Sequence, residues 1–407
     1  MKVLLVGSGG REHALAWRLS QTAYLQELHA APGNPGIAQL GECHPVRAED
    51  AEGLLALCRE LAVDLAVVGP ETPLVAGLAD TLRHAGVAVF GPSRGAARLE
   101  GSKSFAKDVL EAAGVPTARR LAIARPPCVV KADGLAAGKG VFVCRTQEEL
   151  DAGLRNAAAL GRNLVIEELL EGEEVSLFAL TDGRRTFALA PAQDYKRVGD
   201  GDTGPNTGGM GSYSPVPGLG EPEVDELLDT VHRPVLAELA NSGTPFAGLL
   251  YAGLMLTRDG PRVLEFNCRF GDPETQSLLP RIEGDLLGAL WGAATGELAA
   301  DMRVSQRAAV TVVLAGGDYP ERNDSGTPIE GVEEAERTGA LVFHAGTARR
   351  GERLVTNGGR ILNVTAVGDD LAAARATAYD AVERISFAGM RFRGDIGLAA
   401  VESRVGG

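Results

Sequence analysis

Three short apolar runs in the first hundred residues constrain the fold of this chain more than any other feature. The runs are Lys2–Val6, Leu65–Val68 and Val87–Phe90; each precedes a glycine turn, and helical patterns separate them. Strands that alternate with helices form a parallel sheet with helices on both faces. Ligands of such sheets bind at the carboxyl ends of the strands. The sequence therefore predicts an α/β unit over residues 1–100 whose ligand-binding loops follow these three strands.

The remaining residues divide into further units, because 407 residues exceed one ordinary domain. A pattern of strand, glycine-rich loop, strand, helix and strand ends at Glu168 and indicates a small α/β unit inserted into a larger one. Residues 198–218 form a long loop without periodicity, which is usually functional or disordered. We predict an N-terminal substrate-binding domain (1–100), a central domain (101–120 and 188–304), a lid domain (121–187) and a C-terminal domain (305–407).

Charge and cysteine content limit the classes of partner. The net charge is −14, so phosphate backbones and anionic lipids repel the chain at long range. The five cysteines are scattered without a Cys-x-x-Cys pair, which favours reduced thiols over a disulfide framework or a zinc site. The apolar start is too short for a signal peptide or a membrane span. We therefore expect a cytoplasmic monomer that binds small molecules, with no nucleic acid or membrane partner.

The turn Gly7-Ser8-Gly9-Gly10-Arg11-Glu12 is similar to the start of a dinucleotide-binding fingerprint. Glu12 stands where the third glycine is required, and no acidic residue closes the next strand. The turn therefore favours a phosphate-sized anion near Gly9, Gly10 and Arg11, at a helix N-terminus, over NAD. A glycine turn that only allows tight strand–helix packing is the alternative.

Two lysines indicate a site for nucleotide phosphates. Lys103 lies in the first turn of a helix, where a cation opposes the helix dipole, although a solvated lysine is an equal alternative. Lys131 ends a strand that should be buried, and a buried lysine usually has an anionic partner. The glycine-rich loop 133–140 that follows can fold its amides over phosphate oxygens. Lys131 and this loop together favour nucleotide phosphate over a plain hairpin.

Two further groups of polar residues follow along the chain: an acidic segment and a group on a strand. Glu167 and Glu174 flank the point where an edge strand leaves its sheet. This segment could offer backbone groups to an adenine and a carboxylate to ribose hydroxyls. For this segment alone, an exposed acidic turn is the simpler explanation. Residues two apart in a strand face the same way, so Glu265 and Asn267 present two oxygens together while Leu264 faces the core. Such oxygens suit Mg²⁺.

Arg269 follows this strand and could bind a carboxylate or phosphate with both of its terminal nitrogens. A purely structural pair between Glu265 and Arg269 is the alternative. Charged side chains are rarely buried without a reason, which favours a functional role.

These residues resemble the ATP-grasp superfamily and, more narrowly, the phosphoribosylamine–glycine ligase family. The resemblance is strongest in Arg269-Phe270-Gly271-Asp272-Pro273-Glu274-Thr275-Gln276 and in Pro205-Asn206-Thr207-Gly208-Gly209-Met210-Gly211, and it extends over the whole chain. It implies a parallel α/β domain, a two-part ATP-grasp fold with a mobile lid, and a small C-terminal α+β domain. It also implies the ATP-dependent ligation of glycine to 5-phosphoribosylamine through glycyl phosphate.

The resemblance further implies the roles of individual residues. Arg269 and Asp272 would act in catalysis, and Glu265 and Asn267 would ligate Mg²⁺ or Mn²⁺. ATP would contact Lys103, Lys131, Gly138, Gly140, Glu167, Leu169 and Glu174, and the other substrates would contact Gly9, Gly10, Arg11, Glu71, Asp194, Lys196, Asn206, Gly208 and Gly209. Another ATP-grasp carboxylate–amine ligase, a nicotinamide-dependent oxidoreductase and a non-catalytic nucleotide-binding regulator are the alternatives.

Overall fold

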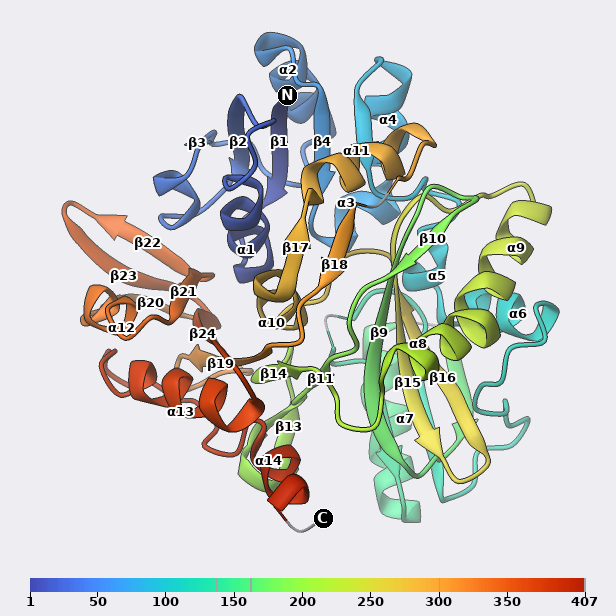
Figure 1. Cartoon of the computed structure of the whole chain (residues 1–407). Helices are drawn as coiled ribbons and strands as arrows, with labels where there is room; N and C mark the ends of the chain where they lie inside the picture. Colours follow the sequence, from blue (N-terminus) through green and yellow to red (C-terminus); the bar gives the residue numbers. More distant parts are fainter. Residues whose placement is uncertain (137, 162, 300, 406–407) are drawn as a thin grey trace.

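The computed structural model of the chain describes residues 1–136, 138–161, 163–299 and 301–405 (Figure 1). Ala137 of the predicted glycine-rich loop and the last two residues of the predicted C-terminal domain lie outside the described residues. Within the described part, none of the helices combines the length and apolar character that crossing a bilayer requires.

The N-terminal unit is a parallel sheet with helices on both faces, as the sequence predicts. Its elements are β1 (Lys2–Gly7), α1 (Gly10–Leu19), β2 (Glu27–Pro32), β3 (Glu42–Cys43), α2 (Ala51–Leu61), β4 (Leu65–Val68), α3 (Glu71–Ala76), α4 (Leu78–His84) and β5 (Ala88–Phe90). The strand order is β3-β2-β1-β4-β5, and all neighbours are parallel. Leu4 and Val6 pack against α2–α4, whereas Val3 and Leu5 pack on the side of α1.

A small separate layer, here called the lid, contains β6 (Cys128–Ala132), β7 (Val141–Cys144), α7 (Gln147–Leu160) and β8 (Leu164–Glu168). The antiparallel strands have the order β7-β6-β8, so β8 is an edge strand as predicted. Thr146 begins α7 because its side chain accepts a hydrogen bond from the amide of Glu149, which completes a capping box. Leu150 and Ala157 of α7 are buried against the sheet, which gives the lid a small core of its own.

The central sheet has the order β10-β9-β15-β16 and contains β9 (Glu173–Thr181), β10 (Thr186–Ala188), β15 (Gly248–Thr257) and β16 (Gly260–Asn267). Three helices pack on one face, namely α6 (Lys103–Ala112), α8 (Glu221–Leu227) and α9 (Arg233–Asn241). Ser102 caps α6, because its side chain accepts a hydrogen bond from the amide of Phe105. The predicted lid boundary at residue 187 puts β9 in the lid, but β9 pairs along its length with β15.

The C-terminal unit is a second five-stranded sheet with the order β11-β14-β19-β24-β21. Its elements are β11 (Gln193–Asp194), β14 (Gly211–Ser214), β19 (Ala308–Ala315), β21 (Leu341–His344), β24 (Arg360–Gly368) and the covering helix α13 (Leu371–Val382). Smaller elements beside it are β20 (Asp324–Pro328), α12 (Val332–Glu336), β22 (Thr347–Arg350), β23 (Arg353–Gly358) and α14 (Leu398–Val405).

The description of residues 198–218 as a loop without secondary structure is wrong. A hairpin of β12 (Arg197–Gly199) and β13 (Thr203–Asn206) opens this segment, and β14 ends it. Strand β14 forms because it pairs with β19, which lies far along the chain. The propensities of neighbouring residues do not predict such a pairing. Strands β11 and β14 therefore belong to the C-terminal sheet, although the predicted boundary assigns them to the central domain.

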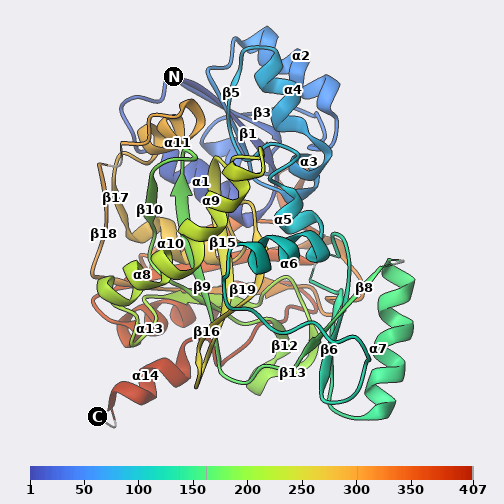
Figure 2. The same ribbon diagram turned by 90° about the vertical axis from the view of Figure 1, so that its right-hand side faces the viewer.

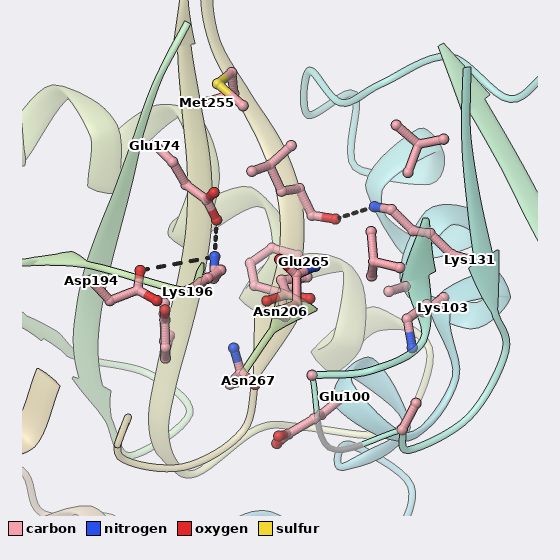
Figure 3. Close-up of a pocket in the computed structure, with 18 of the residues that line it drawn as sticks. Glu100, Lys103, Lys131, Glu174, Asp194, Lys196, Asn206, Met255, Glu265 and Asn267 are labelled. Atoms are coloured by element: carbon pink, nitrogen blue, oxygen red, sulfur yellow. Dashed lines mark hydrogen bonds and ion pairs between the residues drawn. The ribbon is translucent and has the colours of Figure 1, made fainter. Parts of the chain in front are cut away.

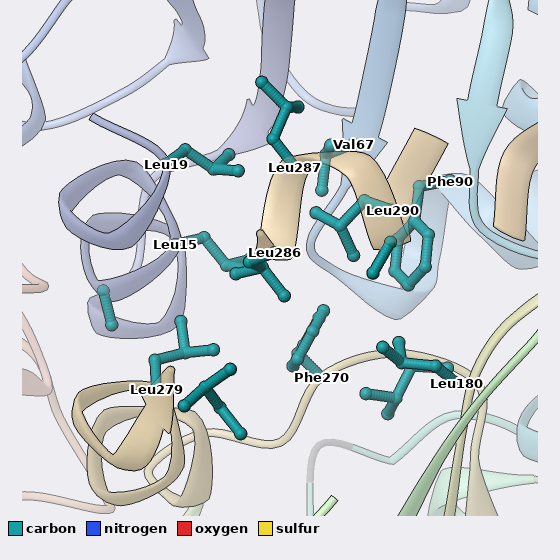
Figure 4. Close-up of a cluster of buried hydrophobic side chains, with 14 of the residues drawn as sticks. Leu15, Leu19, Val67, Phe90, Leu180, Phe270, Leu279, Leu286, Leu287 and Leu290 are labelled. Atoms are coloured by element: carbon teal, nitrogen blue, oxygen red, sulfur yellow. The ribbon is translucent and has the colours of Figure 1, made fainter. Parts of the chain in front are cut away.

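One apolar cluster joins the N-terminal sheet to the central unit (Figure 4). Leu15 of α1 and Phe90 of β5 pack with Leu286 of α11 (Leu286–Thr295) and Leu180 of β9. Phe270, 2% exposed, lies in the same cluster with its ring centroid 5.9 Å from that of Phe90. Burial of a side chain of this size stabilises the fold by about 1.5–3 kcal/mol. The shared core fixes the loop after β16 against the N-terminal unit.

Two views place the lid and the C-terminal helices on different sides of the central sheet (Figure 1, Figure 2). The helix α10 (Glu274–Leu278) and the strands β17 (Ile282–Gly284) and β18 (Met302–Val304) lead from β16 to the C-terminal sheet. The chain between β16 and α10 contacts the N-terminal unit through Arg11 and Glu71 and the C-terminal sheet through Arg360.

Candidate active site

A cavity of about 1010 Å³ lies between the lid, the central sheet and the N-terminal unit. Its walls come from α6, β6 and β8 on one side and from β9, β15 and β16 on the other. Figure 3 shows the lysines of the lid side facing the strand that carries Glu265. Residues from every larger unit of the fold meet here, so the cavity is the candidate active site.

Two lysines and one glutamate form a buried ionic cluster on the lid side. The carboxylate of Glu167 lies 2.9 Å from Nζ of Lys107 and 2.8 Å from Nζ of Lys131. Lys131 also donates a hydrogen bond of 2.9 Å to the carbonyl of Leu264. The predicted anionic partner of Lys131 is therefore the protein's own carboxylate, which fixes the ammonium group at the cavity wall.

Lys103 lies beside this cluster without an ion pair among the described residues. Its Nζ donates a hydrogen bond of 2.8 Å to the carbonyl of Gly134, and its backbone amide donates one of 2.6 Å to Oδ1 of Asp133. Burial lowers the pKa of Lys103, and the neighbouring Glu265 only partly offsets this effect. An anion in the cavity would therefore stabilise the charged form of this lysine.

Glu265 and Asn267 both line the cavity from β16. Burial raises the pKa of Glu265, but Lys196, Lys131 and Lys103 outweigh it and hold the pKa below its usual value. The carboxylate therefore stays ionised beside an amide oxygen donor. A hard divalent cation prefers such oxygen ligands, so the side chains present fit Mg²⁺ or Mn²⁺.

The expectation that Leu264 faces the core is wrong. The register of β15 and β16 pairs Gly253 with Glu265 and Leu254 with Val263, which leaves Leu264 in a β-bulge. A bulge adds one residue to the strand and interrupts the alternation of its side chains. Leu264 therefore lines the cavity beside Glu265.

Two carboxylates and one lysine lie together on the wall formed by β9 and the segment around β11. Lys196 forms an ion pair with Glu174 and lies 3.9 Å from Asp194. Burial raises the pKa of Asp194 well above its usual value, and the charges of Glu274 and Glu265 add to this effect. Asp194 therefore holds its proton more tightly than an ordinary aspartate, whereas Glu174 has a cation in contact.

Arg269 lies between two carboxylates at the end of the cavity nearest the N-terminal unit. Its Nε lies 3.2 Å from Glu71, and one Nη lies 2.9 Å from Glu100. Burial raises the pKa of Glu71, but the guanidinium groups of Arg269 and Arg11 hold it at about 2. Burial raises the pKa of Glu100. The partners of Arg269 are thus these two residues, and no ion pair with Glu265 exists among the described residues.

The loop after β13 meets the loop after β16 through an arginine of the C-terminal sheet. Arg360 donates hydrogen bonds to the carbonyls of Gly208 (2.5 Å) and Asp272 (2.7 Å), and its second Nη lies 3.2 Å from the Asp272 carboxylate. Gly209 has a φ of +106°, and a Cβ there would lie 2.4 Å from Pro273. The approach of the two loops therefore requires glycine at this position.

The N-terminus of α1 is occupied by the protein's own carboxylate. Gly9 donates its amide hydrogen to Oε2 of Glu12 at 2.6 Å, and Arg11 donates from Nε to Oε1 at 2.6 Å. Glu12 thus takes the position that an anion would take at this helix. Arg11 lines the cavity, whereas Gly9 and Gly10 do not. The predicted phosphate contact at these glycines remains a prediction.

Most of the predicted site residues line the cavity, whereas Gly9, Gly10, Gly140 and Gly209 do not. Those that line it are Arg11, Glu71, Lys103, Lys131, Gly138, Glu167, Leu169, Glu174, Asp194, Lys196, Asn206, Gly208, Glu265, Asn267, Arg269 and Asp272.

The charged residues of this cavity that are absent from the predicted site include Glu100, Lys107, Glu274 and Arg360. A signal for Lys107 exists, because it follows Lys103 by four residues and must share its helix face. Glu274 lies within the Arg269–Gln276 run that carries the resemblance. Glu100 and Arg360 have no such local signal, because they reach the site through contacts between distant segments.

Comparisons with known proteins agree with this architecture. Three domain models of phosphoribosylglycinamide synthetase match the chain: the N domain over residues 1–100, the ATP-grasp (A) domain over 101–275 and the C domain over 309–399. A phosphoribosylamine–glycine ligase of Streptomyces coelicolor is 52% identical, with 98% of this chain and 99% of the relative covered. One of Agrobacterium fabrum is 48% identical, with the same coverage of both chains.

Solved structures give the same result. The crystal structure of a phosphoribosylamine–glycine ligase from Thermotoga maritima has a TM-score of 0.85 and 34% identity, and covers 97% of this chain and 100% of its own. A biotin carboxylase domain from Hydrogenobacter thermophilus, with a TM-score of 0.72 and 18% identity, covers 96% of this chain and 91% of its own and shares the fold.

The lid, the central sheet and the cavity between them define an ATP-grasp enzyme, a ligase driven by ATP. The multidomain α/β and α+β fold predicted from the sequence is confirmed. With all three domains matched and relatives about half identical over nearly the whole length, the chain belongs to the phosphoribosylglycinamide synthetase family.

Proposed function

We propose that the chain joins glycine to 5-phosphoribosylamine at the expense of ATP, giving glycinamide ribonucleotide, ADP and phosphate in purine biosynthesis. One observation carries the proposal: Glu265 and Asn267 line the same cavity as Lys103 and Lys131. A cation site beside two lysines suits the transfer of a phosphoryl group, because the charge that develops must be neutralised. Relatives named for this reaction match the chain at full length.

ATP binds between the lid and the central sheet in this proposal. Lys103 and Lys131 contact its phosphates, with Gly138 and Gly140 in the loop that covers them. Glu167 and Leu169 lie at the adenine, and Glu174 at the ribose. Glu265 and Asn267 hold Mg²⁺ or Mn²⁺, which when bound lowers the cost of the negative charge that gathers on the phosphates.

Glycine binds at the cluster of Arg269 and Glu71. A zwitterion requires a cation for its carboxylate and an anion for its ammonium group, and this pair offers both within 3.2 Å. Glu71 remains ionised because its pKa lies at about 2. Asp272, which Arg360 holds in place, lies beside them in the cavity.

The chemistry follows from the weakness of a carboxylate as an electrophile. Transfer of the γ-phosphoryl group of ATP to the glycine carboxylate gives glycyl phosphate, and the amine of phosphoribosylamine then displaces phosphate. No side-chain nucleophile is required, and Cys268 is only 1% exposed. Because water hydrolyses an acyl phosphate, the lid should close over the cavity before phosphoryl transfer.

The phosphoribosylamine remains to be positioned. We propose contacts to Gly9, Gly10, Arg11, Asp194, Lys196, Asn206, Gly208 and Gly209.

Several expectations from the sequence stay predictions. They are the four-domain division, a cytoplasmic location, a monomeric state, and the exclusion of nucleic acid and membranes as partners. Another carboxylate–amine ligase of the same fold is the alternative.

The test is phosphate release from ATP and Mg²⁺, with glycine and freshly prepared phosphoribosylamine each omitted in turn. Release that requires both, with glycinamide ribonucleotide detected by mass spectrometry in equal amount, supports the proposal. Release without phosphoribosylamine, or with another amino acid in preference to glycine, would favour the alternative ligase. Arg269→Lys should raise the KM for glycine more than that for ATP, and equal changes would contradict the proposed contact.

A further inference from the structure

Four polar side chains gather at the edge of the N-terminal sheet, on strands that contribute nothing to the described lining of the active-site cavity. Glu27 and His29 belong to β2, Glu42 belongs to β3, and His44 follows β3 directly. The register pairs His29 with Glu42, and residues two apart in a strand point to one face. All four side chains therefore lie on the same face of the sheet edge.

The two histidines present ring nitrogens to each other. Nδ1 of His29 lies 3.1 Å from Nε2 of His44 and 3.9 Å from Oε2 of Glu42. Ligand atoms of His29, Glu42 and His44 all lie within 4.8 Å of one another. On the far side of its ring, Nε2 of His29 lies 3.2 Å from Oε2 of Glu27.

The contact with Glu27 fixes the tautomer of His29. A carboxylate only accepts, so Nε2 of His29 must carry the hydrogen, and Nδ1 of the neutral ring keeps its lone pair. That lone pair points at His44 and Glu42. A carboxylate that orients a histidine while its other nitrogen binds a metal is the usual arrangement around zinc.

We propose that His29, His44 and Glu42 bind a divalent transition-metal ion of the zinc class, with Glu27 as the residue that orients His29. Zinc bonds of about 2.0–2.1 Å at a tetrahedral angle separate two ligand atoms by about 3.3 Å, close to the 3.1 Å between the two imidazoles. The Glu42 side chain is 68% exposed and can rotate toward the ion. Two imidazoles and one carboxylate leave a further position for water.

This site differs in chemistry from the zinc sites that the scattered cysteines argue against, because its ligands are imidazole and carboxylate. Its effect would be to fasten β3, which has only two residues, to β2 at the edge of the sheet. A hydrogen bond between two neutral histidines is the competing explanation. It requires no metal and predicts no stoichiometric binding.

The test uses the full chain, stripped with EDTA and titrated with Zn²⁺ against a chromophoric chelator. Wild type should bind one equivalent of Zn²⁺. His44→Ala and Glu42→Gln should weaken the Zn²⁺ affinity strongly, by about a hundredfold for His44→Ala. Glu27→Gln should weaken it by about 10–100-fold. His84→Ala, which removes an exposed histidine of α4, is the matched control and should keep the equivalent. Glu265→Gln should also keep it, which distinguishes this site from the active-site carboxylates.

Ligase activity with Mg²⁺ should be unchanged in Glu42→Gln and His44→Ala, which confirms that these variants fold. The proposal is overturned if wild type binds no equivalent of Zn²⁺, or if both His44→Ala and Glu42→Gln bind it as tightly as wild type does.

Discussion

Glu167 offers the sharpest test of how the cavity is built. Its side chain is 4% exposed, and its carboxylate contacts Lys107 (4% exposed) and Lys131 (8% exposed). Glu167→Gln keeps the shape of the side chain and removes its charge. Two nearly buried ammonium groups then lose their only anionic partner among the described residues.

The burial of these groups sets the expected loss in the free energy of unfolding. Removing one partner of a buried ion pair costs about 3–5 kcal/mol. The cavity admits water, and the remaining amide oxygen still accepts one hydrogen bond, so we expect a loss of about 2–3 kcal/mol. At about 2–4 °C per kcal/mol, the thermal unfolding midpoint should fall by about 4–12 °C.

Glu168→Gln is the matched control on the same strand. Glu168 lies 3.3 Å from Arg119, and the two side chains are 36% and 75% exposed, so this pair contributes at most about 1 kcal/mol. Differential scanning fluorimetry of both variants, with and without Mg-ATP, measures the difference. Nucleotide should restore part of the stability of Glu167→Gln, because phosphate replaces the missing negative charge. If Glu167 served only the adenine, the variant would lose ATP affinity without losing stability in the absence of nucleotide, and the counter-ion argument would be refuted.

Three further predictions follow from the geometry. Burial lowers the pKa of His13 to about 3 and that of His344 to about 4, so both side chains take up protons on unfolding below pH 6.5. The thermal unfolding midpoint should therefore fall as the pH drops from about 6.5 toward 4, and a constant midpoint across this range would contradict the prediction. Glu265→Gln should raise the Mg²⁺ concentration for half-maximal activity at least about tenfold, measured by phosphate release at fixed ATP, because one of the proposed ligands loses its charge. Gly134 and Gly138 both have positive φ, but a Cβ would meet backbone only at Gly138, 2.9 Å away; Gly138→Ala should raise the KM for ATP several-fold more than Gly134→Ala, and equal values would exclude steric hindrance as the cause.

The sequence predicts the parts of this molecule that local patterns encode. Strands β1, β4 and β5 are apolar on both faces and lead into glycine turns, so their existence and their parallel pairing follow from short windows of sequence. The same reasoning places Glu265 and Asn267 together on β16, because alternation in a strand is a local property. It fails one residue earlier, at Leu264, because a β-bulge depends on how β15 pairs with β16. A break in periodicity of this kind has no sequence signature of its own.

Contacts between distant segments explain what the sequence does not reveal. Arg360 reaches Asp272 across 88 positions, and Glu100 reaches Arg269 from a different unit of the fold. Neither pairing alters the local pattern around its members. Strand β9 has the same property, because its place in the central sheet depends on its pairing with β15 rather than on the residues beside it.

The charge of the cavity shows why composition and site must be argued separately. The chain carries a net charge of −14, yet four lysines line the cavity: Lys103, Lys107, Lys131 and Lys196. Three of them contact a carboxylate of the protein, and this contact offsets the free-energy cost of burying their charge in the absence of a ligand. The ammonium group of Lys103 contacts a backbone carbonyl and, among the described residues, no carboxylate; burial lowers its pKa, so an anion would stabilise its charged form. In the proposed function, recognition of phosphate depends on Lys103, whose position is set by the contacts of α6 with Asp133 and Gly134 of the lid.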